Sequence, residues 1–389
     1  MLRKSIVVLV LLFESLLVSG CSSTDVKSIE KLNYVSSIGV DYVDGEYHSY
    51  IQLLEFLTVA KTDNKQQAPS NIWIGEGIGL SFEDSLFDLY RTSQEKIYWG
   101  HMTAIVISES AFKQGIGKIY DSFVRYYEFR LTPWVYGTRE SVKDIFSTSG
   151  FYQQSPLATI LHEPQGVYSQ NSLIKSVRLH RLISQINESG FTSCIPTLVV
   201  NNNQWVETNK AEPKLMIDGA FFLKNEEFRS YIPLEKLNGL RWIQPGTIRA
   251  SIAIPSKEDE DVQMVVDKPK TKLKLVQEGN KPQYNILMKA TGSIISRTNN
   301  NLTGLQQLTN ETKSAIEKEI REVYQIGLSE QTDILNLEYT LYRTDNKKWK
   351  AMSPVEETLL TENTINDIKI DLNITHSSSM KNSRMGRSN

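Results

Sequence analysis

The side chains most able to do acid–base or metal chemistry are few and widely spaced in this 389-residue sequence. Its histidines are His48, His101, His162, His180 and His376. None of them has a partner at metal-ligand spacing, and neither HExxH nor CxxC occurs. The sequence also lacks a GxSxG nucleophile turn and a phosphate loop ending in Gly-Lys-Ser/Thr. It therefore predicts no catalytic residue, no metal site and no cofactor, and so a protein that is not an enzyme.

Three other features suggest chemistry but have a simpler interpretation. The run from Gly75 to Gly79 is similar to a dinucleotide-binding turn, but its third glycine comes one residue early. We interpret this run as a turn before a helix. His101 lies beside a predicted strand, where a lone histidine usually forms a backbone hydrogen bond. Glu83 and Asp84 are adjacent, so they point to different faces of a helix. We interpret them as carboxylates that stabilise the positive N-terminal end of the helix dipole, and not as an acid–base pair.

The strongest chemical signal is Cys21, which follows a short apolar run. Two basic residues followed by the apolar residues 6–13 are typical of an export signal. The small residues Ser19 and Gly20 then precede the cysteine. This stretch resembles a bacterial lipobox, in which the thiolate of Cys21 takes a diacylglyceryl group before cleavage between Gly20 and Cys21. The alternative is an ordinary buried cysteine after a secretory signal, but the polar residues 22–24 favour a tether.

The apolar run is too short to cross a bilayer comfortably, since a spanning helix needs about 20 apolar residues. Two acyl chains, at ~0.8 kcal/mol per buried methylene, give stable anchoring. The sequence therefore predicts a signal peptide over residues 1–20 and a mature chain that sits on a membrane without spanning it.

Composition narrows the possible partners and the redox chemistry. The formal net charge is −2, and no long basic run occurs, so the sequence predicts that the chain does not bind nucleic acid. Cys194 is the only other cysteine, which predicts a chain without a disulfide and a buried structural thiol at that position. The large aromatic residues Trp99, Trp134, Trp242 and Trp349 are more typical of a core than of an interface.

The first part of the chain alternates between β-rich and amphipathic segments. Asp44-Gly45 separates β-rich runs over 35–43 and 47–56, which predicts a hairpin. A polar surface loop is expected over 60–70. Strands are then expected at 103–108, 134–137 and 195–200, and helices after the N-cap Ser81, within 110–127, at 140–147, at 157–161 and at 172–185. This order predicts a mixed α/β region around one sheet.

The second part has a different pattern. Strands are expected at 215–223, 249–254, 262–266, 271–276, 284–295, 334–342 and 365–374, with one long helix over about 304–327. This order predicts an α+β arrangement in which the long helix packs across an antiparallel sheet. The expected division is a signal peptide over 1–20, an N-terminal region over 21–205 that could split into two subdomains, a C-terminal domain over 206–376 and a disordered tail over 377–389.

Short segments along the chain, taken in order behind the lipobox, resemble the Ger(x)C family of spore germinant receptor C-subunit lipoproteins. In the first half these segments are Gly79–Ser85, Trp99–Met102, Ile105–Glu109, Phe123–Arg130 and Tyr136–Thr138 followed by Ser141. In the second half they are Asp218–Phe222, Leu240–Trp242, Thr332–Leu335 and Trp349. The sequence departs from the family pattern at Asn336-Leu337, where the resemblance leads us to expect a glycine and an aromatic residue.

The resemblance implies a non-catalytic subunit on the outer face of the spore inner membrane. It implies assembly with a membrane-spanning A subunit and a transporter-like B subunit, and a part in the germination response to a nutrient. It leaves open whether the chain itself binds the nutrient. The alternative from the residues alone is a solute-binding lipoprotein that delivers a small molecule to a transporter, but that class needs βαβ repeats in both halves.

Overall fold

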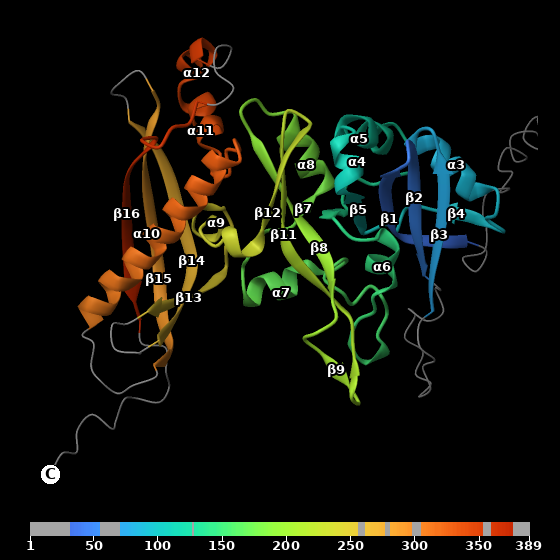
Figure 1. Ribbon diagram of the computed structural model, residues 1–389, viewed down its shortest axis with the longest axis horizontal. Coiled ribbons are helices and arrows are strands. Elements are labelled where there is room, and N and C mark those ends of the chain that lie inside the picture. The colour runs from blue at the N-terminus through green and yellow to red at the C-terminus, as the bar shows by residue number, and fades with distance from the viewer. Residues whose placement is uncertain are drawn as a thin grey trace, which may run out of the picture.

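A computed structural model describes residues 32–54, 71–126, 128–255, 261–276, 281–297, 305–352 and 359–375. Two β-sheets lie one after the other along the long axis of the molecule (Figure 1). The strands nearest the N-terminus are at one end, and the C-terminal sheet is at the other. The predicted signal peptide, Cys21, His376, the loop over 60–70 and the tail over 377–389 lie outside the described residues. The chain is therefore elongated, with α and β elements mixed as expected.

The larger sheet has ten strands and a parallel centre with antiparallel edges. Its main path runs β12-β11-β8-β6-β5-β1-β2-β3, while β4 pairs with β1 and β7 with β6. The strands are β1 (Leu32–Val43), β2 (Glu46–Leu54), β3 (Ile72–Gly79), β4 (Lys96–Tyr98), β5 (Ala104–Ser108), β6 (Trp134–Thr138), β7 (Val177–Arg178), β8 (Thr192–Asn201), β11 (Lys214–Lys224) and β12 (Glu227–Pro233). A small hairpin of β9 (Val206–Glu207) and β10 (Lys210–Ala211) projects from the loop between β8 and β11.

The predicted first hairpin is confirmed. Asp44 and Gly45 have φ of 52° and 92°, so both residues of the two-residue turn have positive φ, as in a type I′ hairpin turn. The flanking strands β1 and β2 pair from Val43↔Glu46 onward. The sequence signal and the backbone geometry agree because glycine carries no Cβ penalty at positive φ.

The glycine-rich run over 75–79 is not a turn, as the sequence suggested, but the end of strand β3. Its three glycines face α3 (Phe82–Tyr90), and a Cβ on Gly77 would lie 2.1 Å from the carbonyl oxygen of Ser85. The missing side chains therefore let the helix lie directly on the strand. The Ser81 hydroxyl accepts a hydrogen bond from Asp84 N (3.1 Å), so the predicted N-cap is confirmed.

Helices cover both faces of the larger sheet. One face carries α3, α4 (Glu109–Lys113), α5 (Ile116–Arg125) and α8 (Leu179–Ile186), whose buried residues form one core with Ile38, Val40 and Ile105. The other face carries α6 (Val142–Ser147), which packs with Tyr50 and Tyr136. Short helices η2 (Phe151–Gln153) and α7 (Pro164–Gln170) follow in the chain.

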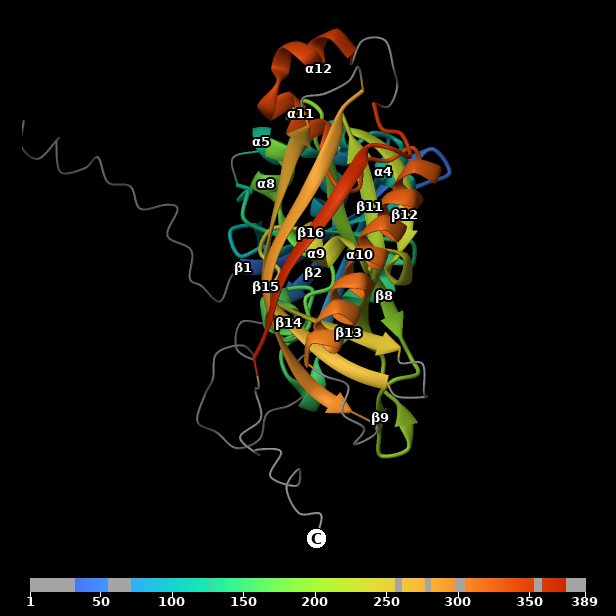
Figure 2. The same ribbon diagram turned by 90° about the vertical axis from the view of Figure 1, so that its left-hand side faces the viewer.

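The C-terminal sheet has four strands in the order β13-β14-β15-β16. They are β13 (Arg249–Pro255), β14 (Asp261–Val276), β15 (Gln283–Arg297) and β16 (Ile365–Ile374). The first three pair antiparallel, as expected, and β16 joins β15 in parallel. The expected strands over 262–266 and 271–276 are one strand, β14, with an irregularity between Asp267 and Lys270. Figure 2 shows β14, β15 and β16 side by side.

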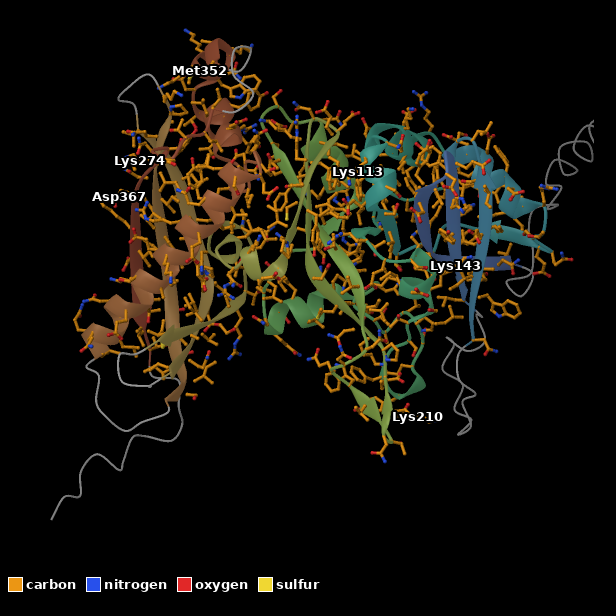
Figure 3. The ribbon with its side chains drawn as sticks, in the orientation of Figure 1. Lys113, Lys143, Lys210, Lys274, Met352 and Asp367 are labelled. Carbon is orange, nitrogen blue, oxygen red and sulfur yellow. The ribbon has the colours of Figure 1, made fainter. Side chains whose placement is uncertain are left out.

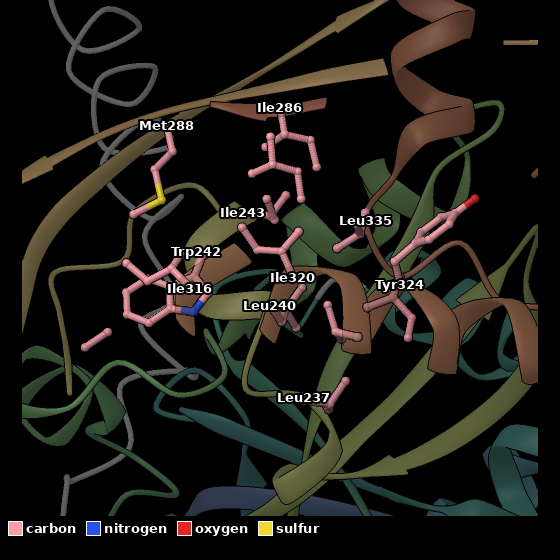
Figure 4. Close-up of a cluster of buried hydrophobic side chains, with 14 of the residues drawn as sticks. Leu237, Leu240, Trp242, Ile243, Ile286, Met288, Ile316, Ile320, Tyr324 and Leu335 are labelled. Carbon is pink, nitrogen blue, oxygen red and sulfur yellow. The ribbon is translucent and has the colours of Figure 1, made fainter. Parts of the chain in front are cut away.

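The long helix α10 (Leu305–Ser329) packs across this sheet, and its existence and position are confirmed. Its apolar stripe includes Ile316, Ile320 and Tyr324, which lie against Ile286 of β15 and against the segment after β12 (Figure 4). That segment holds η3 (Leu234–Lys236) and α9 (Leu240–Ile243), and its Trp242 is 1% exposed. One continuous core therefore joins the sheet, α10 and the connection from the larger sheet.

Two expected elements are wrong, and a third begins later than expected. The strand over 334–342 is instead α11 (Leu337–Thr344), because Leu337 and Leu341 fall one helical turn apart on a buried face. Residues 157–161 form turns, and the expected helix over 172–185 starts only at Leu179. The reason for the late start is tertiary, since Val177 and Arg178 pair with β6. A further helix, α12 (Asn346–Met352), follows α11.

Strands β11 and β12 belong to the larger sheet, although they follow the polar and charged run over 207–213, beside which we expected a domain boundary. β11 pairs with β8 over almost its whole length, from Lys214↔Asn201 to Lys224↔Thr192. The polar run itself forms the β9–β10 hairpin. The division into regions over 21–205 and 206–376 remains a prediction.

Candidate functional site

The histidines in the described residues are dispersed, as the sequence suggested. His101 is exposed and packs between the rings of Tyr34 and Tyr98, and His180 Nδ1 lies 3.0 Å from the Leu131 carbonyl oxygen. His48 and His162 instead belong to polar clusters on the larger sheet. Within the described part of the chain, no three His, Cys, Asp or Glu side chains are placed to hold a metal ion.

The first cluster surrounds Glu76 on the edge strand β3. Its carboxylate lies 3.0 Å from His48 Nδ1 and 2.6 Å from Lys143 Nζ. Burial would raise the pKa of Glu76, but hydrogen bonds from Lys143, His48 and Tyr50 outweigh it and hold the pKa below its usual value. Burial and the neighbouring carboxylate raise the pKa of Tyr50. This carboxylate is therefore ionised and fully engaged, which is the arrangement of a structural ion pair.

The second cluster is buried beneath α6 and centres on Gln52. Its side-chain oxygen accepts hydrogen bonds from Ser36 Oγ (2.6 Å) and Ser37 Oγ (3.0 Å) and lies 3.2 Å from His162 Nε2. The amide oxygen of Gln52 has no proton to donate, so His162 carries its proton on Nε2, and Nδ1 faces the Thr103 hydroxyl at 2.5 Å. Burial lowers the pKa of His162 to about 3. The network joins β1, β2 and the loop before α7 without a free functional group.

The third polar cluster lies where the C-terminal unit meets the larger sheet, and we call it the junction cluster: Lys224, Asp333, Asn336, Glu338 and Thr192. Lys224 Nζ, at the end of β11, donates to Glu338 Oε2 on α11 at 2.5 Å. The second oxygen of Glu338 accepts from Leu359 N at 3.1 Å. The Glu338 side chain is 5% exposed, so this ion pair is largely withdrawn from water. Lys224 and Glu338 are 114 residues apart and connect the two sheets.

Asn336 makes the second connection in the junction cluster. Its side-chain amide pairs with the backbone of Thr192 on β8, accepting from Thr192 N at 2.7 Å and donating to Thr192 O at 3.1 Å. Asn336 has φ of 56°, the left-handed conformation that glycine favours and asparagine tolerates. The departure from the expected glycine at this position therefore keeps the turn and adds two hydrogen bonds across the junction.

Asp333 gives the junction cluster a titratable group. Its Oδ2 accepts from Glu338 N at 2.7 Å, while its Oδ1 is buried without a hydrogen-bond partner among the described residues. Burial, and then the nearby Glu338 carboxylate, raise the pKa of Asp333 to about 7, although the backbone donors at 337 and 338 and the Lys224 ammonium act in the opposite direction. The ionised form of Asp333 is therefore disfavoured in the folded chain.

This shift predicts a pH dependence of stability. The pKa of Asp333 is raised above its usual 3.8, so between about pH 4 and 7 the folded state keeps the Asp333 proton and the unfolded chain does not. The free energy of unfolding therefore falls as pH rises through this range, and the stability that the bound proton contributes is lost above pH 7. Asp333→Asn cannot ionise and should remove this loss, an effect on the order of a few kcal/mol. Urea unfolding of both proteins at pH 5 and pH 8 measures it. An equal change of unfolding free energy with pH in both proteins would contradict the assignment.

Further contacts fix the junction at the opposite end of the sheets and beside α11. Ser172 N donates to Arg249 O at 2.7 Å, and Ser172 Oγ accepts from Ile248 N and Arg249 N. Beside the junction cluster, the Phe191 and Tyr339 rings meet edge to face at 4.9 Å. The larger sheet and the C-terminal unit are therefore held together by hydrogen bonds at two separate places, with a shared core between them.

The remaining predicted residues fall into the core or outside the described chain. Cys194 lies on β8, where burial raises the pKa of its thiol to about 12, as expected for a structural thiol. Trp99 and Trp242 are fully buried, and the Arg178 guanidinium stacks on Trp134 at 3.9 Å. Cys21 is not among the described residues. No helix in the described ranges combines the length and the apolar character that a bilayer-spanning segment requires.

Comparison with known families accounts for most of the chain. Residues 25–200 match the family model described as spore germination protein N-terminal domain. Residues 217–378 match the model described as spore germination B3/GerAC like, C-terminal. The junction cluster draws residues from both matched ranges, so it connects the two matched parts of this chain.

A curated protein and a solved structure are also similar to this chain. Spore germination protein B3 of Bacillus subtilis (strain 168) is 22% identical over 318 residues, which are 79% of this chain and 81% of the relative. A crystal structure of the GerBC protein superimposes with a TM-score of 0.51 at 16% identity, covering 90% of this chain and 100% of that one. At that identity the structural match shows a shared fold alone. The mixed α/β architecture described above is thus shared with the crystal structure of the GerBC protein.

Proposed function

Because this chain belongs to the Ger(x)C family of germinant receptor C-subunits in spore germination, we propose that it is a lipid-anchored, non-catalytic subunit that assembles its receptor at a membrane. The observation that carries this proposal is positional. The first family match begins four residues after Cys21, and the two matches together account for most of the remaining chain. The cysteine at the end of the predicted signal peptide therefore stands directly before the receptor-subunit module.

The lipid anchor would hold the chain at the membrane, and the folded part would bind the other receptor subunits. Cys21 would carry two acyl chains, which hold a protein on a bilayer stably where one chain is marginal. The first described residue, Leu32, starts β1, which lies in the part of the larger sheet remote from the C-terminal unit. We place the anchored chain on the outer face of the spore inner membrane, with the membrane-spanning A and B subunits of the receptor as its partners.

The junction favours a scaffold over a two-lobed solute-binding protein. A solute-binding lipoprotein closes two lobes around a ligand, and such closure needs a hinge between them. Here the shared core, the Lys224–Glu338 pair and the Ser172–Arg249 contact fill the space between the sheets. The C-terminal unit also has three antiparallel neighbours, β13, β14 and β15, where that class needs βαβ repeats.

The chain's two cysteines provide a matched test of the anchor. Cys21→Ala should leave the precursor without lipid and lower its membrane-bound fraction by about tenfold or more, because no other anchor is proposed. Spores that carry this variant should also germinate more slowly with the nutrient that the receptor recognises. Cys194→Ala changes the same residue type inside the fold and should stay in the membrane fraction. Undiminished membrane retention of Cys21→Ala would refute the anchor.

A further inference from the structure

The outer face of the C-terminal sheet carries an ordered group of lysines. The strand register places three rows of three residues across β14, β15 and β16. These rows are Lys270, Lys289 and Asp371; Lys272, Leu287 and Lys369; and Lys274, Asn285 and Asp367. We call these nine residues the lysine face. It contains five lysines and two aspartates, a local charge of +3, on a chain whose net charge is −2.

The alternation of β14 shows that this face is turned away from the core. Thr271 Oγ1 donates to Trp242 O at 2.6 Å, and Leu273 and Leu275 pack against the C-terminal core. The residues between them, on the other side of the strand, are exposed. Figure 3 shows Lys274 and Asp367 on the outside of the sheet, at the opposite end of the molecule from Lys143. The lysine face is therefore open to a partner.

The charges on the lysine face are not neutralised evenly. Lys289 lies 3.7 Å from Asp371, and Lys369 lies 3.5 Å from Asp367. The three β14 lysines, at 270, 272 and 274, form no ion pair with any residue of the described ranges. Scattered lysines on an exposed sheet keep it soluble and discourage edge pairing. Three consecutive outward positions of one strand with the same uncompensated charge instead make a linear array.

We propose that the lysine face docks an acidic, extended segment of a partner protein. Outward residues of a strand repeat every two residues, about 6.6–6.8 Å, and carboxylates at alternate positions of an extended segment repeat at the same distance. Such a segment alongside β14 can place one carboxylate near each of Lys270, Lys272 and Lys274. Complementary charge of this kind fixes register and excludes wrong partners more than it adds raw affinity.

A protein segment fits the position of this face better than a lipid surface does. The C-terminal sheet lies at the other end of the long axis from β1, where the described chain begins (Figure 1). If the anchor holds the chain near β1, the lysine face points away from that membrane. The position of the lysine face relative to the membrane rests on the proposed anchor, whereas the charge array does not. The anchor and the docking of an acidic segment can therefore fail separately.

The binding experiment uses the mature chain and defined probes. The first probe is a fluorescent ten-residue peptide of alternating glutamate and threonine, and the second is vesicles of phosphatidylglycerol and phosphatidylcholine. The triple variant K270E/K272E/K274E should bind the peptide about tenfold more weakly or worse. The matched control K118E/K210E/K236E makes the same charge change at exposed lysines elsewhere and should bind like the wild type. The neutral variant K270Q/K272Q/K274Q should lose part of the affinity. It tests the proposal even if the charge-reversed variant fails to fold.

A crosslinking experiment in spore membranes tests the partner itself. The full chain with p-benzoylphenylalanine in place of Lys272 should crosslink to a partner protein. The crosslinked site should lie in a segment of that partner with carboxylates at alternate positions. The same substitution at Lys118 should not give that product. Equal peptide binding by all three triple variants, vesicle binding that depends on the β14 lysines, or an adduct to lipid or to a non-acidic peptide would each overturn the proposal. Loss of the Cys21 anchor would leave the peptide-binding result unchanged.

Discussion

Replacing Lys224 with methionine should destabilise the folded chain by about 3–5 kcal/mol, because it leaves the buried Glu338 carboxylate without its cation. The backbone donor Leu359 N, at 3.1 Å, satisfies one oxygen of this carboxylate but does not neutralise its charge. Asp333 lies close by and would share the uncompensated negative environment. Urea unfolding of Lys224→Met at neutral pH measures the effect.

Two variants show whether the loss comes from the buried charge. Arg125→Met removes one partner of an exposed ion pair with Asp121 and should leave the midpoint of urea unfolding close to that of the wild type. The double variant Lys224→Met with Glu338→Leu removes both charges and should recover much of the stability. If Lys224→Met unfolds at the same urea concentration as Arg125→Met, the Lys224–Glu338 pair does not hold the junction.

Replacing Gly77 with valine should cost about 3 kcal/mol or more, or prevent folding, because there is no space for a side chain beneath α3. A Cβ there would lie 2.1 Å from Ser85 O and 2.9 Å from Leu89 N, and backbone atoms cannot move aside as a flexible side chain does. Thermal unfolding measures the loss.

Gly166→Ala is the control for this substitution. A Cβ at Gly166, in α7, meets nothing within 4 Å, and alanine is the better helix former. This variant should be as stable as the wild type or slightly more so. Equal stability of Gly77→Val and Gly166→Ala would show that α3 does not lie directly on β3.

The sequence predicted those elements whose signal is local. The Asp44-Gly45 turn, the Ser81 N-cap and the long apolar stripe of α10 each need only a few neighbouring residues to specify them, and the structure confirms all three. The order of segments after Cys21 also pointed to the family that the comparisons show.

The elements that failed depend on contacts distant in sequence. The glycine run over 75–79 has the composition of a turn, but α3 packs against it and makes it a strand. The segment over 334–342 contains β-rich residues, yet burial of Leu337 and Leu341 on one face makes it helical. The start of α8 is delayed because Val177 pairs with β6. Local propensity is a weak prior in each case, and tertiary packing overrides it.

The junction cluster was beyond sequence reasoning for the same reason. Asn336 and Thr192 are 144 residues apart, and one chain without its relatives gives no sign that they meet. One available signal was asparagine where the family resemblance suggested glycine, since asparagine is the residue that best replaces glycine at positive φ. The lysine face had a clearer signal, the alternating lysines of β14, which becomes informative only when the register with β15 and β16 is known.

The central claim is that Cys21 holds this receptor subunit on the membrane, and the mass of the native chain's N-terminal peptide tests it most directly. We predict that the peptide isolated from spore membranes begins at Cys21 and carries a diacylglyceryl group on its sulfur. A native chain that keeps residues 1–20, or that begins at Cys21 with an unmodified thiol, would contradict the account.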